Sequence, residues 1–230
     1  MEQLRNFGDE RQMAFCAYCG GGTETRDHVP AKVFLDEPYP TNLPVVPACR
    51  SCNEGFSLDE EYVACLIECV VTGTVHADGI NREKVKRILR QKPLLGSKLS
   101  QARKERKKGV YFDVETDRIK NVVLKLARGH AAFELNEPQL DEPSSLVFIP
   151  FPFMSQKDLK DFETTRGSPI SIWPEVGSRA MQRLMVNSPG SSMWIPIQPG
   201  RYRYLASVDD GLVIRMVVSE YLACEVAWNT

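Results

Sequence analysis

The sequence lacks several features that would place a protein in a class at once. Its 29 lysine and arginine residues balance 30 aspartate and glutamate residues, so the net charge of −1 points to no particular partner. The longest apolar stretches, around 62–71 and 146–154, are too short or too broken to cross a bilayer. The N-terminal residues MEQLRNFGDE contain no apolar signal core, and the chain has no internal repeat. We therefore expect a cytoplasmic protein.

Histidine is scarce, with three in 230 residues, but cysteine has a marked pattern. Four of the seven cysteines form two pairs, Cys16-x-x-Cys19 and Cys49-x-x-Cys52. An odd total with four cysteines in such knuckles is typical of metal binding and not of a disulfide framework. The spacing predicts a tetrahedral zinc site in a reducing compartment. The other three lie in apolar surroundings and are expected to be small core residues: Cys65, Cys69 and Cys224.

Three polar residues beside the knuckles are the candidates for chemistry. Asp27 and His28 lie between the two knuckles, and Asn53 directly follows the last cysteine. Because an unperturbed imidazole titrates near neutrality, His28 can take a proton from water as a general base. Asp27 and Asn53 offer hard oxygen ligands, which suit Mg²⁺ or Mn²⁺ better than zinc. Four thiolates would close the zinc tetrahedron, so we expect zinc to be structural and a second cation to be catalytic.

Four segments together carry a resemblance to a known family: CAYC (16–19), RDHVPAKVF (26–34), TNLPVV (41–46) and CRSCNEGFS (49–57). In their order and spacing they resemble the HNH endonucleases of the four-cysteine zinc kind, over about a quarter of the chain. Asn53 stands where many members have histidine. The chain is therefore similar to the His-Asn-Asn variants, such as the phage Holliday-junction resolvases.

The resemblance implies a treble-clef, ββα-metal module in which the strand with Asp27 and His28 faces the start of the helix with Asn53. It implies that Asn42 holds the intervening loop and orients the histidine, and is not a metal ligand. It also implies hydrolysis of DNA phosphodiester bonds to 3′-hydroxyl and 5′-phosphate ends, in restriction, mobile elements or anti-phage defence. Two other interpretations stay open: a non-catalytic zinc module that binds DNA or a protein partner, and a nuclease that cuts RNA.

The sequence predicts an α+β fold in two regions. Residues 1–75 would form the HNH zinc module, and residues 80–230 a mixed α+β region for substrate binding, oligomerisation or partner docking. Ser57 and Glu60 have the spacing of a capping box. The elements expected in the module are a strand-like segment over 25–35, a return strand over 43–46 and an amphipathic helix over 58–71.

The second region has weaker patterns. The sequence Asp209-Asp210-Gly211 predicts a β-hairpin turn. We expect helices over 81–91 and 118–135, a helix or mobile basic stretch over 99–108, strands over 110–114, 146–153, 170–174, 201–206 and 213–218, and a strand or helix over 181–186. The inward positions of the two clearest helices are Val85, Ile88 and Leu89, and Val122, Leu126 and Phe133.

Charge is distributed unevenly along the chain. Residues 1–62 carry 5 basic and 11 acidic side chains, whereas residues 82–108 carry 12 basic and 2 acidic ones. An acidic metal-binding head followed by a basic segment suits a polyanionic substrate, although a basic run is also typical of a solvated helix face. Lys32 and Arg50 are open to the same two interpretations.

Two further groups of residues invite a functional interpretation that we do not favour. Arginine and tyrosine alternate over 201–204, which would suit stacking on nucleic acid. We expect instead a strand with its tyrosines inward and its arginines outward. His76 and His130 are isolated in the sequence, and we assign them no chemistry.

Overall fold

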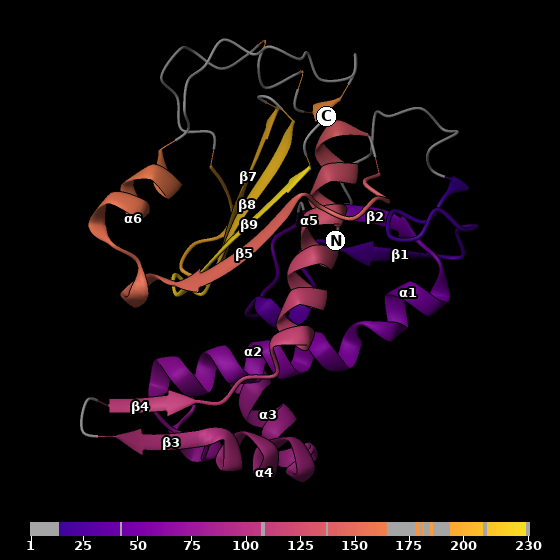
Figure 1. The fold of residues 1–230 in the computed structure, drawn as a ribbon. Helices are drawn as coiled ribbons and strands as arrows, with labels where there is room; N and C mark the ends of the chain where they lie inside the picture. The colour runs from indigo at the N-terminus through magenta and orange to yellow at the C-terminus, as the bar shows by residue number, and fades with distance from the viewer. Residues whose placement is uncertain are drawn as a thin grey trace.

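The structure is a computed structural model, and it describes residues 14–41, 43–106, 109–136, 138–164, 194–208 and 211–228, with positions 178, 179, 181 and 185. Helices and strands are mixed as the α+β class requires (Figure 1). Among the described helices, none combines the length and the apolar character needed to cross a membrane.

The cysteine knuckles adjoin a small antiparallel hairpin and a pair of helices. Strand β1 (Thr25–His28) pairs with β2 (Val45–Ala48) so that Asp27 lies opposite Val46 and His28 opposite Val45. Helices α1 (Arg50–Gly55) and α2 (Ser57–Thr72) follow almost without interruption. The first strand is shorter than expected, because after His28 the chain turns into a 3-10 helix, η2 (Lys32–Phe34).

The predicted capping box is wrong. The N-cap of α2 is Phe56, and no side chain caps the helix there. Ser57 Oγ donates instead to the carbonyl of Glu54, at 2.8 Å, within the last turn of α1. Because α1 runs directly into α2, the first amides of α2 need no separate cap. Glu60 therefore does not cap the helix, and its side chain is buried.

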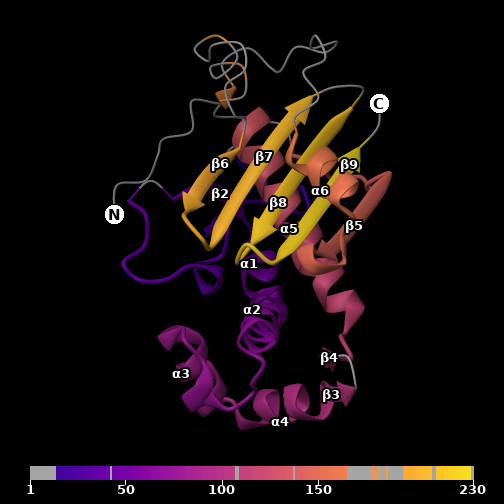
Figure 2. The same ribbon diagram turned by 90° about the vertical axis from the view of Figure 1, so that its left-hand side faces the viewer.

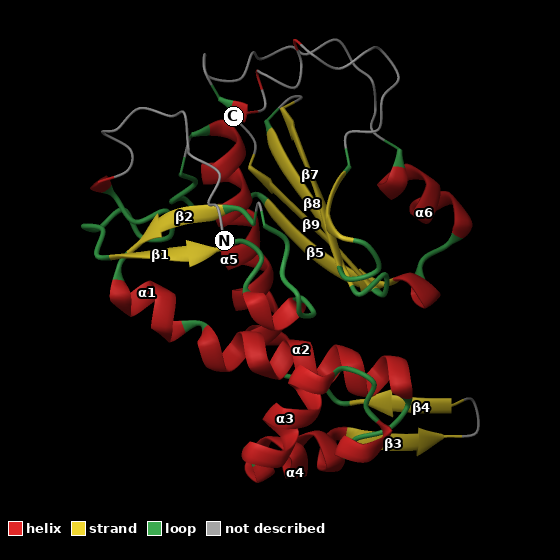
Figure 3. Ribbon diagram, turned by 180° about the vertical axis from the view of Figure 1, so that it is seen from behind, coloured by secondary structure: helices red, strands yellow, loops and turns green. Residues whose placement is uncertain are grey.

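The basic segment folds along the side of α2 that faces away from the large sheet (Figures 1 and 3). A 3-10 turn, η3 (Ala77–Gly79), leads into α3 (Glu83–Gln91), whose expected inward residues Val85, Ile88 and Leu89 are all buried. Helix α4 (Pro93–Ala102) then ends before the charged run. The expectation of a helix or a mobile basic stretch over 99–108 is therefore wrong from Arg103 onward, since β3 (Arg103–Arg106) pairs with β4 (Gly109–Phe112).

Helix α5 (Thr116–Leu135) runs between the small hairpin and a five-stranded antiparallel sheet (Figure 1). It covers one face of that sheet, and α6 (Gln156–Glu163) lies on the other (Figure 2). The strands, in the spatial order β5-β9-β8-β7-β6, are β5 (Ser145–Pro150), β9 (Leu222–Trp228), β8 (Leu212–Val218), β7 (Tyr202–Val208) and β6 (Ile195–Gln198). A 3-10 turn, η4 (Phe151–Phe153), follows β5.

The apolar core runs through α5. The three residues expected on its inward face, Val122, Leu126 and Phe133, are at most 3 % exposed, and they belong to one cluster that extends from Cys16 to Trp228. Both predicted regions contribute to this cluster. The division into residues 1–75 and 80–230 stays a prediction. The remaining three cysteines, Cys65, Cys69 and Cys224, are buried as expected.

Strands β7 and β8 confirm the hairpin predicted at the end of the chain. Tyr202 and Tyr204 are at most 1 % exposed, so these tyrosines pack inward and do not offer a stacking platform. Arg203 lies outward and is bound by Glu163 and Glu220. The strand expected over 170–174 lies outside the described residues, and so do all but two positions of 181–186.

Candidate zinc centre and active-site pocket

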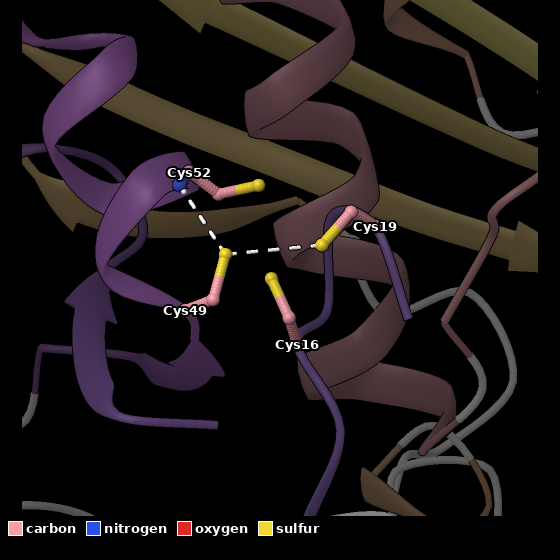
Figure 4. Close-up of side chains that lie close together, drawn as sticks. All are labelled: Cys16, Cys19, Cys49 and Cys52. Atoms are coloured by element: carbon pink, nitrogen blue, oxygen red, sulfur yellow. Dashed lines mark hydrogen bonds between the residues drawn. The ribbon is translucent and has the colours of Figure 1, made fainter. Parts of the chain in front are cut away.

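The four knuckle cysteines converge on one point (Figure 4). Their sulfur atoms all lie within 4.8 Å of one another, and none is in a disulfide. A tetrahedron with zinc–sulfur bonds of about 2.3 Å has edges of about 3.8 Å. The Cys19 and Cys49 sulfurs are 3.8 Å apart. The donor set therefore fits structural zinc, with no position left open for a substrate.

The backbone conformation of each knuckle directs its cysteine side chains towards the cluster. Gly20 has a φ of 72°, a left-handed conformation that glycine adopts without strain, and its amide donates to the Cys16 carbonyl at 2.9 Å. Cys49 is the N-cap of α1, and its sulfur accepts the Cys52 amide at 3.3 Å. That hydrogen bond lowers the pKa of the Cys49 thiol, whereas burial raises the pKa of the Cys52 thiol.

Asp27, His28 and Asn53 line the same cavity, of about 420 Å³. Asp27 and His28 come from the end of β1, and Asn53 comes from α1. Neighbouring residues on a regular strand point to opposite faces, but both can reach this cavity because the strand ends at His28. Residues of η2, α2 and α3 also line the cavity, among them Lys32, Glu60, Glu61, Lys84 and Arg87.

The Asn53 amide is anchored to β1. Its Nδ2 donates to Thr25 Oγ1 at 3.1 Å and to the Arg26 carbonyl at 3.3 Å. Both bonds use the amide nitrogen, so Oδ1 is the atom with which Asn53 would bind a cation.

Asp27 is 7 % exposed and lies in a buried network of charges. Its Oδ2 accepts the Tyr18 hydroxyl at 2.9 Å and lies 2.7 Å from the ammonium of Lys125. The same ammonium is 2.5 Å from Glu60 Oε1. Burial raises the pKa of Glu60, and Lys125 offsets part of that rise. Both described contacts of Asp27 use Oδ2, so a cation in the cavity would be bound by Oδ1.

His28 is half-buried, and its pKa is lowered from the usual histidine value. Burial is the main cause, the charge of Lys32 adds to it, and Asp27 opposes it. A lowered pKa favours the neutral imidazole, which is the form that a general base requires.

The cysteines are the only group of three or more histidine, cysteine, aspartate or glutamate ligands that come together among the described residues. A cation held by Asp27 and Asn53 would thus have two protein ligands, with the rest of its shell left to water and phosphate oxygens. Asn42, expected to orient the histidine, lies outside the described residues.

Of the other residues considered for a functional role in the sequence, Lys32 lies at the cavity, whereas Arg50 and His130 do not. Lys32 lines the cavity, but Arg50 is exposed and does not. His130 is fully buried, with its ring 3.7 Å from that of Tyr204 and its Nε2 2.8 Å from the Tyr202 hydroxyl. These contacts give His130 a structural role in the core.

Sequence reasoning missed four residues of this cavity region. Lys84 and Arg87 lie in a segment already noted as basic, so the signal was present but not resolved to single positions. Lys125 lies on the apolar face of α5, beside Val122 and Leu126. A charge in such a stripe is a signal for a buried partner. The spacing of Glu60 from Ser57 indicates only a helix cap and gives no sign of its ion pair.

Comparison with known proteins gives no relative to argue from. No family model, no curated protein and no solved structure matches this chain. The chemistry of the site therefore has to be argued from its own residues.

Proposed function

We propose that the chain is a metal-dependent endonuclease of the HNH type, which hydrolyses DNA phosphodiester bonds. The observation that carries the proposal is that Asp27, His28 and Asn53 line one cavity beside the four-cysteine cluster. The hairpin β1–β2 followed by α1 agrees in order with a treble-clef, ββα-metal module. A role in restriction or anti-phage defence stays a prediction from the resemblance.

Each residue has a defined task in this mechanism. Neutral His28 takes a proton from water as the water oxygen bonds to phosphorus, and the bond from phosphorus to the 3′-oxygen breaks. Asp27 Oδ1 and Asn53 Oδ1 would hold Mg²⁺ or Mn²⁺. Such a cation supplies neutralising charge to the phosphate and the leaving oxygen. Cys16, Cys19, Cys49 and Cys52 would hold zinc, which would stabilise the short hairpin and helix that adjoin them.

Nicking of supercoiled plasmid DNA in Mg²⁺ or Mn²⁺ tests the proposal. We expect His28→Ala to slow nicking by about 10²- to 10⁴-fold, because a general base contributes on that order. Zinc content, measured by elemental analysis, should not change. The matched control is His76→Ala, since His76 lies outside the cavity and should leave nicking intact.

A second candidate is favoured by one observation, the ion pair of Asp27 with Lys125. Because an ammonium already forms an ion pair with this carboxylate, the cavity could bind a DNA phosphate or a protein partner without a divalent cation. Wild-type protein that binds plasmid but leaves it uncut in both metals would favour this binding module. Faster cleavage of a matched RNA duplex would instead make RNA the substrate.

A further inference from the structure

Three cations that line the active-site cavity form no ion pair with a carboxylate of the described residues. Among the described residues, no carboxylate lies within 4.0 Å of the charged atoms of Lys32, Lys84 or Arg87. The Lys84 ammonium donates to the Lys32 carbonyl at 2.9 Å and to the Tyr39 hydroxyl at 2.7 Å. Arg87 is exposed and makes no hydrogen bond or ion pair within the described chain.

A second cavity, of about 660 Å³, lies on the other side of these residues. Lys84, Arg87 and Gln91 of α3 line both cavities, so the two are neighbours with α3 as their common wall. The positive charge they share is therefore continuous from the active-site cavity into the second one.

The other cations of the second cavity form ion pairs within the protein. Arg82 and Arg201 both bind Asp36, and Arg90 binds Asp78 at 2.7 Å. Glu83 binds Lys86, whereas Glu37 only accepts the Tyr39 hydroxyl, at 2.9 Å, and keeps its negative charge. Among the cations that line this cavity, Lys84 and Arg87 are the two that form no ion pair with a carboxylate of the described residues.

We propose that α3 is a DNA-backbone-binding element, in which Lys84 and Arg87 contact phosphates next to the one held in the active-site cavity. The inference rests on the proposed function for its choice of ligand. A strand running from one cavity to the other would pass these two side chains. Arginine and lysine are the side chains that usually bind phosphates, and they do so without reading sequence.

Salt-dependent DNA binding tests this inference. Fluorescence anisotropy with a labelled duplex, in buffer without added Mg²⁺ or Mn²⁺ so that cleavage is prevented, measures Kd from 50 to 200 mM salt. The double variant Lys84→Gln/Arg87→Gln should bind on the order of 10- to 30-fold more weakly near 150 mM salt. The slope of log K against log salt should flatten by about 1.8, at about 0.9 for each lost contact.

The matched control removes two cations that have acidic partners and line neither cavity. Lys86 binds Glu83 at 2.5 Å on the same helix, and Lys98 binds Glu115 at 2.6 Å on α4. Lys86→Gln/Lys98→Gln loses the same net charge and should keep the wild-type slope. Arg87 forms no hydrogen bond or ion pair with the described residues, so Arg87→Glu alone should fold normally and should also weaken binding. It serves as a second test in case the double variant does not fold.

The outcomes separate this inference from the proposed function. If the wild type nicks DNA and both double variants bind with the wild-type slope, the α3 site is overturned and the nuclease stands. If the wild type does not nick DNA, but the Lys84 and Arg87 changes alone flatten the slope of log K against log salt, the binding site stands and the nuclease is overturned. Equal weakening by both double variants would reduce the effect to net charge and overturn the α3 site.

Discussion

Among single residues, Lys125 compensates the buried negative charge of Asp27 and Glu60. Its side chain is 2 % exposed, and those of its two partners, Asp27 and Glu60, are 9 % and 8 % exposed. One ammonium thus forms ion pairs with two carboxylates that are almost fully shielded from water. Removing one partner from such a group leaves uncompensated charge in a medium of low dielectric constant.

We therefore expect Lys125→Met to lower the free energy of unfolding by about 3–5 kcal/mol in urea titrations at neutral pH. Adding Glu60→Gln to this variant should recover part of the loss, because one buried negative charge disappears. Lys120→Met, an exposed change on the same helix, should stay within about 0.5 kcal/mol of wild type. A Lys125→Met protein as stable as that control would contradict the assigned role.

The contrast between His28 and Lys125 shows what can be predicted at this scale. The knuckle spacing fixes Asp27, His28 and Asn53 relative to one another over a few tens of residues, so their shared cavity follows from local patterns. Lys125 lies 98 positions after Asp27 in the sequence and meets it only because α5 packs against the module. Nothing local to Lys125 identifies its partners.

Among the elements, α5 packs closely against the loop after β1. A Cβ at Gly129 would lie 2.7 Å from Val29 Cγ2 and 3.0 Å from Val29 Cγ1. Val29 is 1 % exposed, so its stiff, branched side chain has no space to move into. Glycine is thus required there for close approach of the helix and not for a special backbone angle.

Gly129→Ala should destabilise the protein by about 1–3 kcal/mol in thermal or urea unfolding, because overpacking outweighs the gain in helix propensity. Gly96→Ala is the matched control in α4, where the nearest atom to an added Cβ is 3.9 Å away. That variant should gain up to about 1 kcal/mol. Stabilisation by both changes would mean that α5 does not approach the β1 loop this closely.

Elements with clear periodicity were predictable, whereas β9 was missed for a physical reason. Helices α3 and α5 show an apolar stripe with a period near 3.6 residues, and the structure places both close to the expected ranges. Strand β9 lies inside the sheet between β5 and β8, and most of its residues are buried. A strand covered on both faces loses the alternation that identifies strands in a sequence.

In the whole molecule, Asp36 connects three distant parts of the chain. Its carboxylate binds Arg82, before α3, at 2.7 Å and also binds Arg201, before β7. Its backbone exchanges two hydrogen bonds, of 2.8 and 3.0 Å, with the side chain of Gln198. Asp36 and Arg201 are 165 residues apart, so no pattern along the sequence could have paired them.

These contacts predict how stability responds to acid. Burial alone would raise the pKa of Asp36, but the hydrogen bonds and charges of Arg82 and Arg201 outweigh burial and lower it. Since the folded pKa lies below the unfolded value of about 3.9, the stabilisation is fully present above that pH and is lost as pH falls through the folded pKa.

Urea unfolding of the wild type and Asp36→Asn, compared between pH 6 and pH 3, tests this linkage. The Asp36 side chain is 36 % exposed and solvent screens its charge, so we expect the variant to be less stable by on the order of 1–2 kcal/mol at pH 6. The difference should shrink towards zero below about pH 4. Both proteins keep the same four cysteines, so zinc release in acid affects both and largely cancels in the comparison. A difference that stays constant down to pH 3 would show that the Asp36 carboxylate does not hold these three parts of the chain together.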